Sequence, residues 1–247
     1  MNSTISCRLP LALCALLVPV ALIAQTARYS LDSAADLRPH NVIVEPETLQ
    51  GKKGLKVTVP AEERRRIAAM SQEERQRAAE RGLIGERLVL IDDLEFGDGV
   101  IEAEIAGDVQ PGAPEGARGF VGIAFRVQND LRTYDAFYLR PTNGRADDQV
   151  RRNHAAQYIS HPDWPWARLR QEFPSKYESY VDLLPGTWTK VRIDVRGEQA
   201  RLYVHDMQQP TLIVNDLKSG AHAKGAVALW IDMDTVAHFR NLLVSRK

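Results

Sequence analysis

Residues 187–205 read TWTKVRIDVRGEQARLYVH, and this stretch decides the fold. Two short strands are expected here, over Thr187–Val195 and Ala200–His205, with a turn at Arg196-Gly197 between them. Upstream, Val100–Ile105 alternates apolar residues with acids. This alternation is typical of an antiparallel sheet that packs one face on a core and exposes the other to water.

Outward from this hairpin, the chain reads mostly as short β-branched and apolar runs bounded by Pro, Gly or acidic turns. Strands do not alternate with helices, and a long stretch between Leu139 and Tyr177 reads as irregular. The pattern predicts an all-β, two-sheet antiparallel sandwich in one domain. The remaining strands are expected at Asn41–Glu45, Leu55–Val59, Arg87–Ile91, Phe120–Val127, Tyr134–Leu139, Tyr177–Leu183, Thr211–Val214, Ala226–Ile231 and Val236–Val244.

Residues 60–82 break this pattern with a charged, Ala-rich segment of 5 Glu and 6 Arg. Ser71 and Glu74 have the spacing of a capping box, and Gly82 is a natural helix end. Two short helices joined near Ser71 are therefore predicted as an insertion between strands. Its charges are typical of a solvated surface, and a lid or docking arm is the alternative.

The N-terminus has the pattern of a secretory signal peptide. Arg8 is followed by an apolar run over Leu9–Ile23, and small residues follow at Ala24 and Ala27. We predict a signal peptide over residues 1–27 and a single domain over 28–247. The run is short for a permanent membrane span, so no span is expected after signal removal, and the protein is expected to be periplasmic or secreted.

Composition limits the classes of partner. The chain has 247 residues, with 32 Lys and Arg against 32 Asp and Glu, so its formal net charge is zero. A nucleic-acid partner is not expected, because such domains carry a strong basic excess. Both cysteines, Cys7 and Cys14, lie in the predicted signal peptide, so no disulfide is expected in the exported protein.

Several motifs occur in a characteristic order. They are GVIEAEI at 99–105, GFVGIAFR at 119–126, WTKVRIDVRG at 188–197, KGAVALW at 224–230 and HFRNL at 238–242. The series resembles the concanavalin A-like lectin and glucanase superfamily of laminin-G-like jelly rolls. Within it, the chain is most similar to the 3-keto-disaccharide hydrolase and family 16 glycoside hydrolase groups.

The resemblance implies two antiparallel sheets, one of them concave, with carbohydrate as the usual ligand class. Members include lectins, binding modules, glycoside hydrolases and protein-interaction domains, so fold alone does not choose a function. Family 16 enzymes carry Glu-x-Asp-x-(x)-Glu on one strand. The nearest segment here has Glu102, Glu104 and Asp108 but no central Asp. We expect Glu102 and Glu104 to form the water-facing side of a strand.

Residues 133–182 carry the candidate ligand site, because 9 of the 17 aromatic residues fall in this stretch. Aromatic faces pack on sugar C–H surfaces, and planar polar groups hydrogen-bond to vicinal hydroxyls. Long connections of mixed polar and aromatic composition tend to be functional. The expected ligand-binding residues are Arg140, Asn143, Arg145, Asp148, Arg152, His154, Gln157, Tyr158, Trp164 and Trp166.

An alternative is a covering loop held by Arg–Asp pairs, with Trp164 and Trp166 as buried anchors. Trp188 and Trp230 lie in strand patterns and are expected in the core.

Catalytic residues are not identified by any complete motif. Asp147, Asp148 and His154 are weak catalytic candidates. The two acids lie next to arginines, which favours their ionised form, and a histidine ordinarily titrates near neutral pH. No metal or cofactor is expected, because no zinc, EF-hand or phosphate-loop spacing is present. Three functions stay open: carbohydrate binding on the 133–182 surface, a glycoside hydrolase or lyase activity on the same surface, and protein interaction through residues 60–82.

Overall fold

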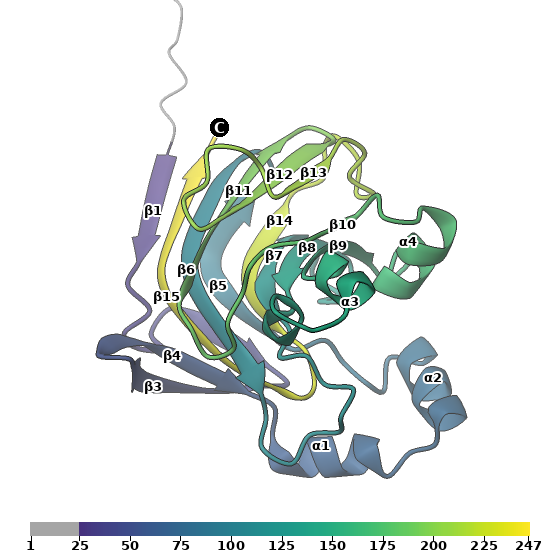
Figure 1. Cartoon of the computed structure of the whole chain (residues 1–247). Helices are drawn as coiled ribbons and strands as arrows, with labels where there is room; N and C mark the ends of the chain where they lie inside the picture. Colours follow the sequence, from purple (N-terminus) through teal and green to yellow (C-terminus); the bar gives the residue numbers. More distant parts are fainter. Residues whose placement is uncertain (1–24) are drawn as a thin grey trace, which may run out of the picture.

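A computed structural model describes residues 25–247 as two antiparallel sheets packed face to face, which confirms the predicted sandwich (Figure 1). Sheet A has the strand order β13-β12-β11-β6-β15-β4-β3, and β1 also pairs with β15. Its strands are β1 (Gln25–Tyr29), β3 (Ile43–Leu49), β4 (Lys52–Thr58), β6 (Gly99–Val109), β11 (Thr189–Arg196), β12 (Gln199–Val204), β13 (Leu212–Val214) and β15 (Thr235–Arg246).

Sheet B has the strand order β10-β9-β8-β7-β14-β5-β2. The opening hairpin is confirmed as β11 and β12, and β11 also pairs with β6 at the centre of sheet A. The strands of sheet B are β2 (Leu37–His40), β5 (Leu88–Phe96), β7 (Val121–Val127), β8 (Tyr134–Leu139), β9 (Ala156–His161), β10 (Glu178–Ser179) and β14 (Gly225–Ile231).

The core lies between the sheets and follows from the period of two along each strand. Val191 and Ile193 of β11 face Ile123 and Phe137 of sheet B, and all four are buried. Large side chains from the two sheets interdigitate to form this close-packed core. Residues 25–247 contain no cysteine, so no disulfide contributes to the core in this part of the chain.

Sheet B is covered on its second face as well, which differs from the simplest sandwich. Figure 1 shows the strands curving toward this face, with short helices lying over β8 and β9. We call it the concave face; it carries Gly122, Tyr138, Gln157 and Trp230, which are neighbours in register. The helices are η1 (Pro141–Asn143), α3 (Gln149–Asn153) and α4 (Trp166–Glu172).

The stretch between Leu139 and Tyr177 was expected to be irregular, and this expectation is wrong. It contains η1, α3 and α4, and β9 pairs with β8 along its whole length. Every residue of β9 but the last is buried, on both faces of the sheet. A strand covered on both sides lacks the polar alternation that marks a half-exposed strand, so its sequence gives little signal.

The predicted helical insertion is confirmed as α1 (Ala61–Ala68) and α2 (Gln72–Glu80). Its capping box is formed: the Ser71 amide donates to Glu74 Oε2 at 2.8 Å, and the Glu74 amide donates to Ser71 Oγ at 3.2 Å. Gly82 has φ +69°, as expected for a helix end. Ile67 is buried on the inner side, while the outer side is charged.

The predicted signal peptide lies mostly outside the described residues. Residues 25–27, placed within it, belong to β1, where Ala27 pairs with Val244 and packs against the core. No helix of residues 25–247 is long and apolar enough to cross a membrane. The signal peptide and the export that it implies stay predictions.

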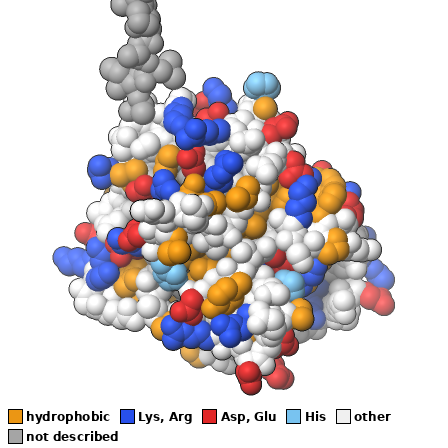
Figure 2. Space-filling view, turned by 45° about the horizontal axis from the view of Figure 1, so that its top comes forward, with side chains coloured by type: hydrophobic (Ala, Val, Ile, Leu, Met, Phe, Trp, Pro, Cys, Tyr) orange, Lys and Arg blue, Asp and Glu red, His pale blue; other side chains and the backbone are white. Residues whose placement is uncertain are grey.

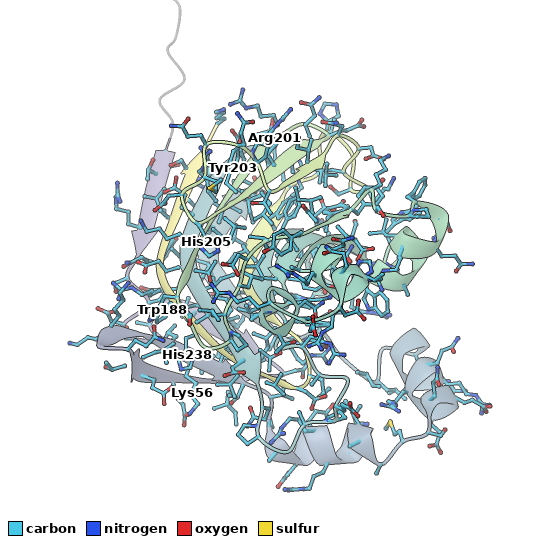
Figure 3. All side chains as sticks on the ribbon, viewed as in Figure 1. Lys56, Trp188, Arg201, Tyr203, His205 and His238 are labelled. Atoms are coloured by element: carbon cyan, nitrogen blue, oxygen red, sulfur yellow. The ribbon has the colours of Figure 1, made fainter. Side chains whose placement is uncertain are left out.

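Of the two tryptophans expected in the core, Trp230 is buried and Trp188 is not. Trp188 lies beside His238 on the outer face of sheet A, near the β3–β4 hairpin (Figure 3). Its Nε1 donates to the Leu49 carbonyl oxygen at 3.0 Å. The prediction failed because an aromatic residue at a strand start is equally compatible with either face.

Candidate functional site

The concave face has an aromatic floor. Trp230 and Tyr138 flank Gly122 in register, and their rings stack above it with centroids 4.8 Å apart. A Cβ at Gly122 would collide with the Phe137 carbonyl oxygen and with Tyr138, so this position needs glycine. Phe120, just before β7, stacks on Tyr138 at 5.3 Å and extends the row.

Arg140 lies at the end of β8, at the edge of this floor. Its side chain is 4% exposed, and its Nη2 donates to Tyr138 Oη at 2.8 Å and to Gln157 Oε1 at 3.1 Å. Nη1 donates to the His154 carbonyl oxygen at 2.8 Å. Three hydrogen bonds therefore hold the guanidinium in one position.

A buried acid lies beside Arg140. Glu178 of β10 is 3% exposed in its side chain and accepts from both Nε and Nη2 of Arg170, at 2.9 and 2.5 Å. Its Oε2 also lies 2.6 Å from His154 Nδ1 and 3.7 Å from Arg140 Nη1. Burial lowers the pKa of His154, and the charges of Arg170 and Arg140 add to this against the opposing charge of Glu178. His154 is thus neutral at pH 7.

These groups lie at one cleft of about 450 Å³, which we call the β8–β9 cleft. The connections between β6 and β7 and between β8 and β9 form its sides together with α4, whose Trp166 is 42% exposed. Val150 of α3 is 66% exposed at the same cleft. The cleft is lined by Gly116, Arg118, Phe120, Arg140, Asn143, Asp148, Val150, Arg151, His154, Trp166 and Arg170.

Five of the residues expected to bind a ligand meet at this cleft: Arg140, Asn143, Asp148, His154 and Trp166. The exposure of Trp166 contradicts its alternative interpretation as a buried anchor. Asn143 is buried, and its Nδ2 donates to the same His154 carbonyl oxygen at 3.2 Å. Asp148 caps α3, since its Oδ1 accepts from the Arg151 amide at 2.9 Å.

Two expected residues lie behind the cleft or away from it. Gln157 is fully buried under Arg140 and donates to the Tyr158 and Tyr177 carbonyl oxygens. Tyr158 points into the core on the opposite face of sheet B, where its hydroxyl donates to Asp135 Oδ1 at 2.6 Å. Adjacent strand residues face opposite sides, so Gln157 and Tyr158 cannot both lie on one surface.

The others lie outside the cleft. Arg145 forms a bidentate, solvent-exposed pair with Asp182, at 2.7 and 2.8 Å, and Arg152 stacks on Tyr180. Asp147 is exposed and does not line the cleft. Trp164 lies at a second hollow of about 650 Å³, where the Arg168 guanidinium carbon is 3.9 Å from its ring centroid.

Several lining residues were not among those expected, above all Arg118 and Phe120. Both precede β7, whereas Arg140 follows β8. Because Val121 pairs with Leu139 in this hairpin, the residues just before β7 meet those just after β8. The register of the predicted hairpin was the signal that could have located them.

The acids of the site do not form a hydrolytic pair. Glycosidases need two carboxyl groups on opposite sides of the scissile bond. Asp148 is the only acid among the residues that line the β8–β9 cleft in the described chain, and both oxygens of Glu178 are held by Arg170. Residues 25–247 also contain no group of three or more His, Cys, Asp and Glu placed to hold a metal ion.

Glu102 and Glu104 lie on the outer face of sheet A, as expected. In the strand register, Glu102 pairs with Arg192 of β11 and Glu104 pairs with Lys190. Such pairs of unlike charge on neighbouring strands stabilise the face. Both acids line a groove of about 490 Å³. The polar side chains there bind one another: Lys190 pairs with Asp206 at 2.7 Å, and Asn241 donates to Glu104 at 2.7 Å. Figure 2 likewise shows acidic and basic side chains intermingled over one face.

Comparison with known proteins identifies the fold. No family model matches the chain, and no curated protein matches it in sequence. Among solved structures, the carbohydrate binding module CBM66 from Bacillus subtilis superposes with a TM-score of 0.53 at 13% identity, over 85% of this chain and 96% of that one. A Bacillus subtilis protein of unknown function with a galectin-like fold gives 0.48 at 11% identity, over 91% and 100%.

A third similar structure is domain 4 of AbnA, a GH43 extracellular arabinanase from Geobacillus stearothermophilus, in complex with arabinotriose. Its TM-score is 0.46 at 10% identity, over 90% of this chain and 93% of that one. At 13% identity, the similarity to the carbohydrate binding module establishes the fold alone. The resemblance to concanavalin A-like jelly rolls is confirmed at that level.

Proposed function

We propose that this protein binds a saccharide in the β8–β9 cleft. The observation that carries the proposal is the exposed ring of Trp166 beside the fixed, buried guanidinium of Arg140, whose carbon lies 5.9 Å from the ring centroid. A ring face that is open to solvent can pack on the C–H surface of a sugar. Beyond the three hydrogen bonds that hold it, the Arg140 guanidinium has one further Nη1 hydrogen and its Nε hydrogen, and such a group can donate to a sugar hydroxyl. Together they supply both contacts that a sugar ring requires.

The surroundings of Arg140 favour a ligand-binding site rather than a loop that only covers the sheet. Hydrogen bonds to Tyr138, Gln157 and the His154 carbonyl oxygen fix Arg140, and Asn143 is buried next to it. A cleft with an apolar rim and a few convergent polar groups is typical of small-ligand sites. The carbohydrate binding module with the same fold adds support by analogy.

Binding without hydrolysis is favoured by the arrangement of acids. Both oxygens of Glu178 are held by Arg170, and Asp148 has no second acid beside it among the described residues that line the cleft, so the pair of carboxyl groups that hydrolysis requires is not formed there. Protein interaction through α1 and α2 has less support. Each helix has one internal ion pair, Glu63 with Arg66 and Glu73 with Arg77, as on an ordinary solvated surface.

A glycan array followed by isothermal titration tests the proposal. Trp166→Ala should reduce the affinity for the bound saccharide at least about tenfold, because truncation of a central aromatic contact typically costs more than 1 kcal/mol. Tyr180→Ala is the matched control: its ring is also 42% exposed but does not line the cleft, so affinity should not change. Equal losses in both variants, or a silent array, would contradict the proposal.

A further inference from the structure

The β8–β9 cleft carries more positive charge than its acids compensate. Four guanidinium groups line it, from Arg118, Arg140, Arg151 and Arg170. Only Asp148 lines it as an acid, and the carboxylate of Glu178 lies behind it. With His154 neutral, four positive charges face two negative ones at this place, although the whole chain has a formal net charge of zero.

The uncompensated positive charge of the cleft lies on two arginines, Arg118 and Arg151. Arg170 is paired with Glu178, and the same carboxylate lies 3.7 Å from Arg140. The guanidinium groups of Arg118 and Arg151 donate only to neutral oxygens among the described residues. Arg118 Nη1 donates to the Glu115 and Ala117 carbonyl oxygens at 2.7 and 2.8 Å, within its own loop.

Arg151 likewise has no carboxylate partner in residues 25–247. Its Nε donates to Asn143 Oδ1 at 2.9 Å, and its Nη2 donates to the Thr142 carbonyl oxygen at 3.0 Å. Most other arginines near the cleft have an acidic partner, as Arg145 has in Asp182 and Arg168 in Glu172. In the described part of the chain, the guanidinium groups of Arg118 and Arg151 thus lack the acidic partner that these neighbours have.

The uncompensated charges also repel one another. Burial lowers the pKa of Arg118, and the charges of Arg151 and Arg140 lower it further, against a smaller opposing effect of Glu115. Thr142 lies between the two residues: its Oγ1 accepts from Arg151 Nη2 at 3.2 Å and donates to the Arg118 carbonyl oxygen at 3.5 Å. Holding like charges together in a partly desolvated cleft is unfavourable unless an anion binds between them.

We infer that the ligand of this cleft is an anionic saccharide, whose carboxylate or sulfate group lies between Arg118 and Arg151 while a sugar face packs on Trp166. This inference rests on the proposed saccharide-binding function and specifies its ligand class. Guanidinium forks bind carboxylate and sulfate oxygens in bidentate fashion, which explains arginine in place of lysine at both positions. A neutral sugar needs no such pair of charges.

The test is isothermal titration of the purified full chain with acidic oligosaccharides and their neutral counterparts. The probes are an oligogalacturonide and its carboxyl-reduced form, and a chondroitin-derived oligosaccharide with and without its sulfate groups. The carboxylate and sulfate arms separate the two sources of negative charge. We expect at least one acidic probe to bind about tenfold more tightly than its neutral form, with affinity falling as salt rises.

The variants assign the effect to the two arginines. Arg118→Gln and Arg151→Gln should each weaken binding of the acidic probe about tenfold, the usual effect of losing one charge-assisted contact, and weaken binding of neutral probes distinctly less. Arg145→Gln is the control, because its guanidinium is 57% exposed, paired with Asp182 and outside the cleft. Arg118→Gln removes contacts only within its own loop, so it keeps the test informative if Arg151→Gln unfolds.

The outcomes separate the two proposals. Equal affinity for acidic and neutral probes, lost in Trp166→Ala, would overturn the anionic ligand and retain saccharide binding. Acidic binding that is unchanged in both arginine variants would overturn the assignment to this cleft. No binding of any acidic or neutral saccharide would overturn both proposals.

Discussion

At the scale of single residues, the candidate site depends on one buried acid. Glu178 is shared by Arg170, His154 and Arg140, and its side chain is 3% exposed. A buried carboxylate is tolerable only when its charge and oxygens are satisfied. Here Arg170 donates to both oxygens, and Arg140 and His154 lie close by. The role of Glu178 is therefore to position the cationic side of the cleft.

Glu178→Gln should lower the free energy of unfolding by about 3 kcal/mol, because it leaves the buried guanidinium of Arg140 and the half-buried one of Arg170 without their counter-charge. Urea unfolding measures this change. Glu172→Gln is the control: its pair with Arg168 is exposed, so the expected change is below about 0.5 kcal/mol. Similar values for the two variants would show that the buried pair contributes no more than a surface pair.

Asp216 gives a pH-dependent prediction at the same scale. Burial raises its pKa, but hydrogen bonds from Lys176, Tyr177 and Lys218 outweigh this and hold the pKa at about 2. The folded pKa lies below the ordinary value of 3.8, so its stabilisation is present above pH 3.8 and disappears as the pH falls toward 2.

Asp216→Asn should cost about 1 kcal/mol at pH 7, since the pairs are partly exposed and screened by solvent. The difference from the wild type should shrink between pH 4 and pH 2. Chemical unfolding curves of both proteins across this range measure it. A difference that stays constant with pH would mean that the charge of Asp216 does not stabilise the fold.

At the scale of elements, β9 and the insertion show opposite relations between sequence and structure. β9 is buried on both faces and has no clear strand pattern, so tertiary packing fixes it as a strand. α1 and α2 are specified locally by Ala, charged residues and the capping box of Ser71 and Glu74. Local chemistry therefore predicted α2 correctly.

Ser71→Ala should destabilise α2 by about 1 kcal/mol, because the Glu74 amide loses its capping acceptor, the Ser71 hydroxyl. Hydrogen exchange of the α2 amides measures this local effect, while melting of the sandwich should change little. Arg75→Ala, at an exposed position of the same helix, should not accelerate exchange. If exchange of the α2 amides is unchanged in Ser71→Ala, the capping box does not stabilise the helix.

At the scale of the whole molecule, one arginine joins turns of both sheets. Arg126 of β7 is fully buried and donates to the carbonyl oxygens of Gly97, Gly197 and Gly220, at 3.2, 2.9 and 2.8 Å. It also donates to Asp98 Oδ1 at 3.2 Å. These turns follow β5, β11 and β13, so Arg126 closes the end of the sandwich where they meet.

Arg126→Leu should lower the free energy of unfolding by about 3 kcal/mol or more, because several buried acceptors lose their donors together. Thermal and urea unfolding measure the change. Arg196→Leu is the control, since Arg196 is 64% exposed and paired only with Asp194. Its effect should stay within about 0.5 kcal/mol, and an equal loss in both variants would contradict a special role for Arg126.

The sequence by itself determined the all-β class, most strands, the opening hairpin and the helical insertion. These features follow from side-chain periodicity and turn or cap chemistry, which are local properties of the chain. It also located the stretch that contains Arg140, Asn143 and Trp166. Five of its ten expected ligand-binding residues meet at the β8–β9 cleft.

Only the tertiary structure decided which of these residues share a surface. Tyr158 and Gln157 differ by one position, yet one lies in the core and the other under Arg140. Arg118 joins the cleft from a distant part of the chain through the register of β7 and β8. Composition and periodicity depend only on residue types and their spacing along the chain. Strand pairing and the covering of both faces of sheet B determine which charged side chains meet and which stay unpaired.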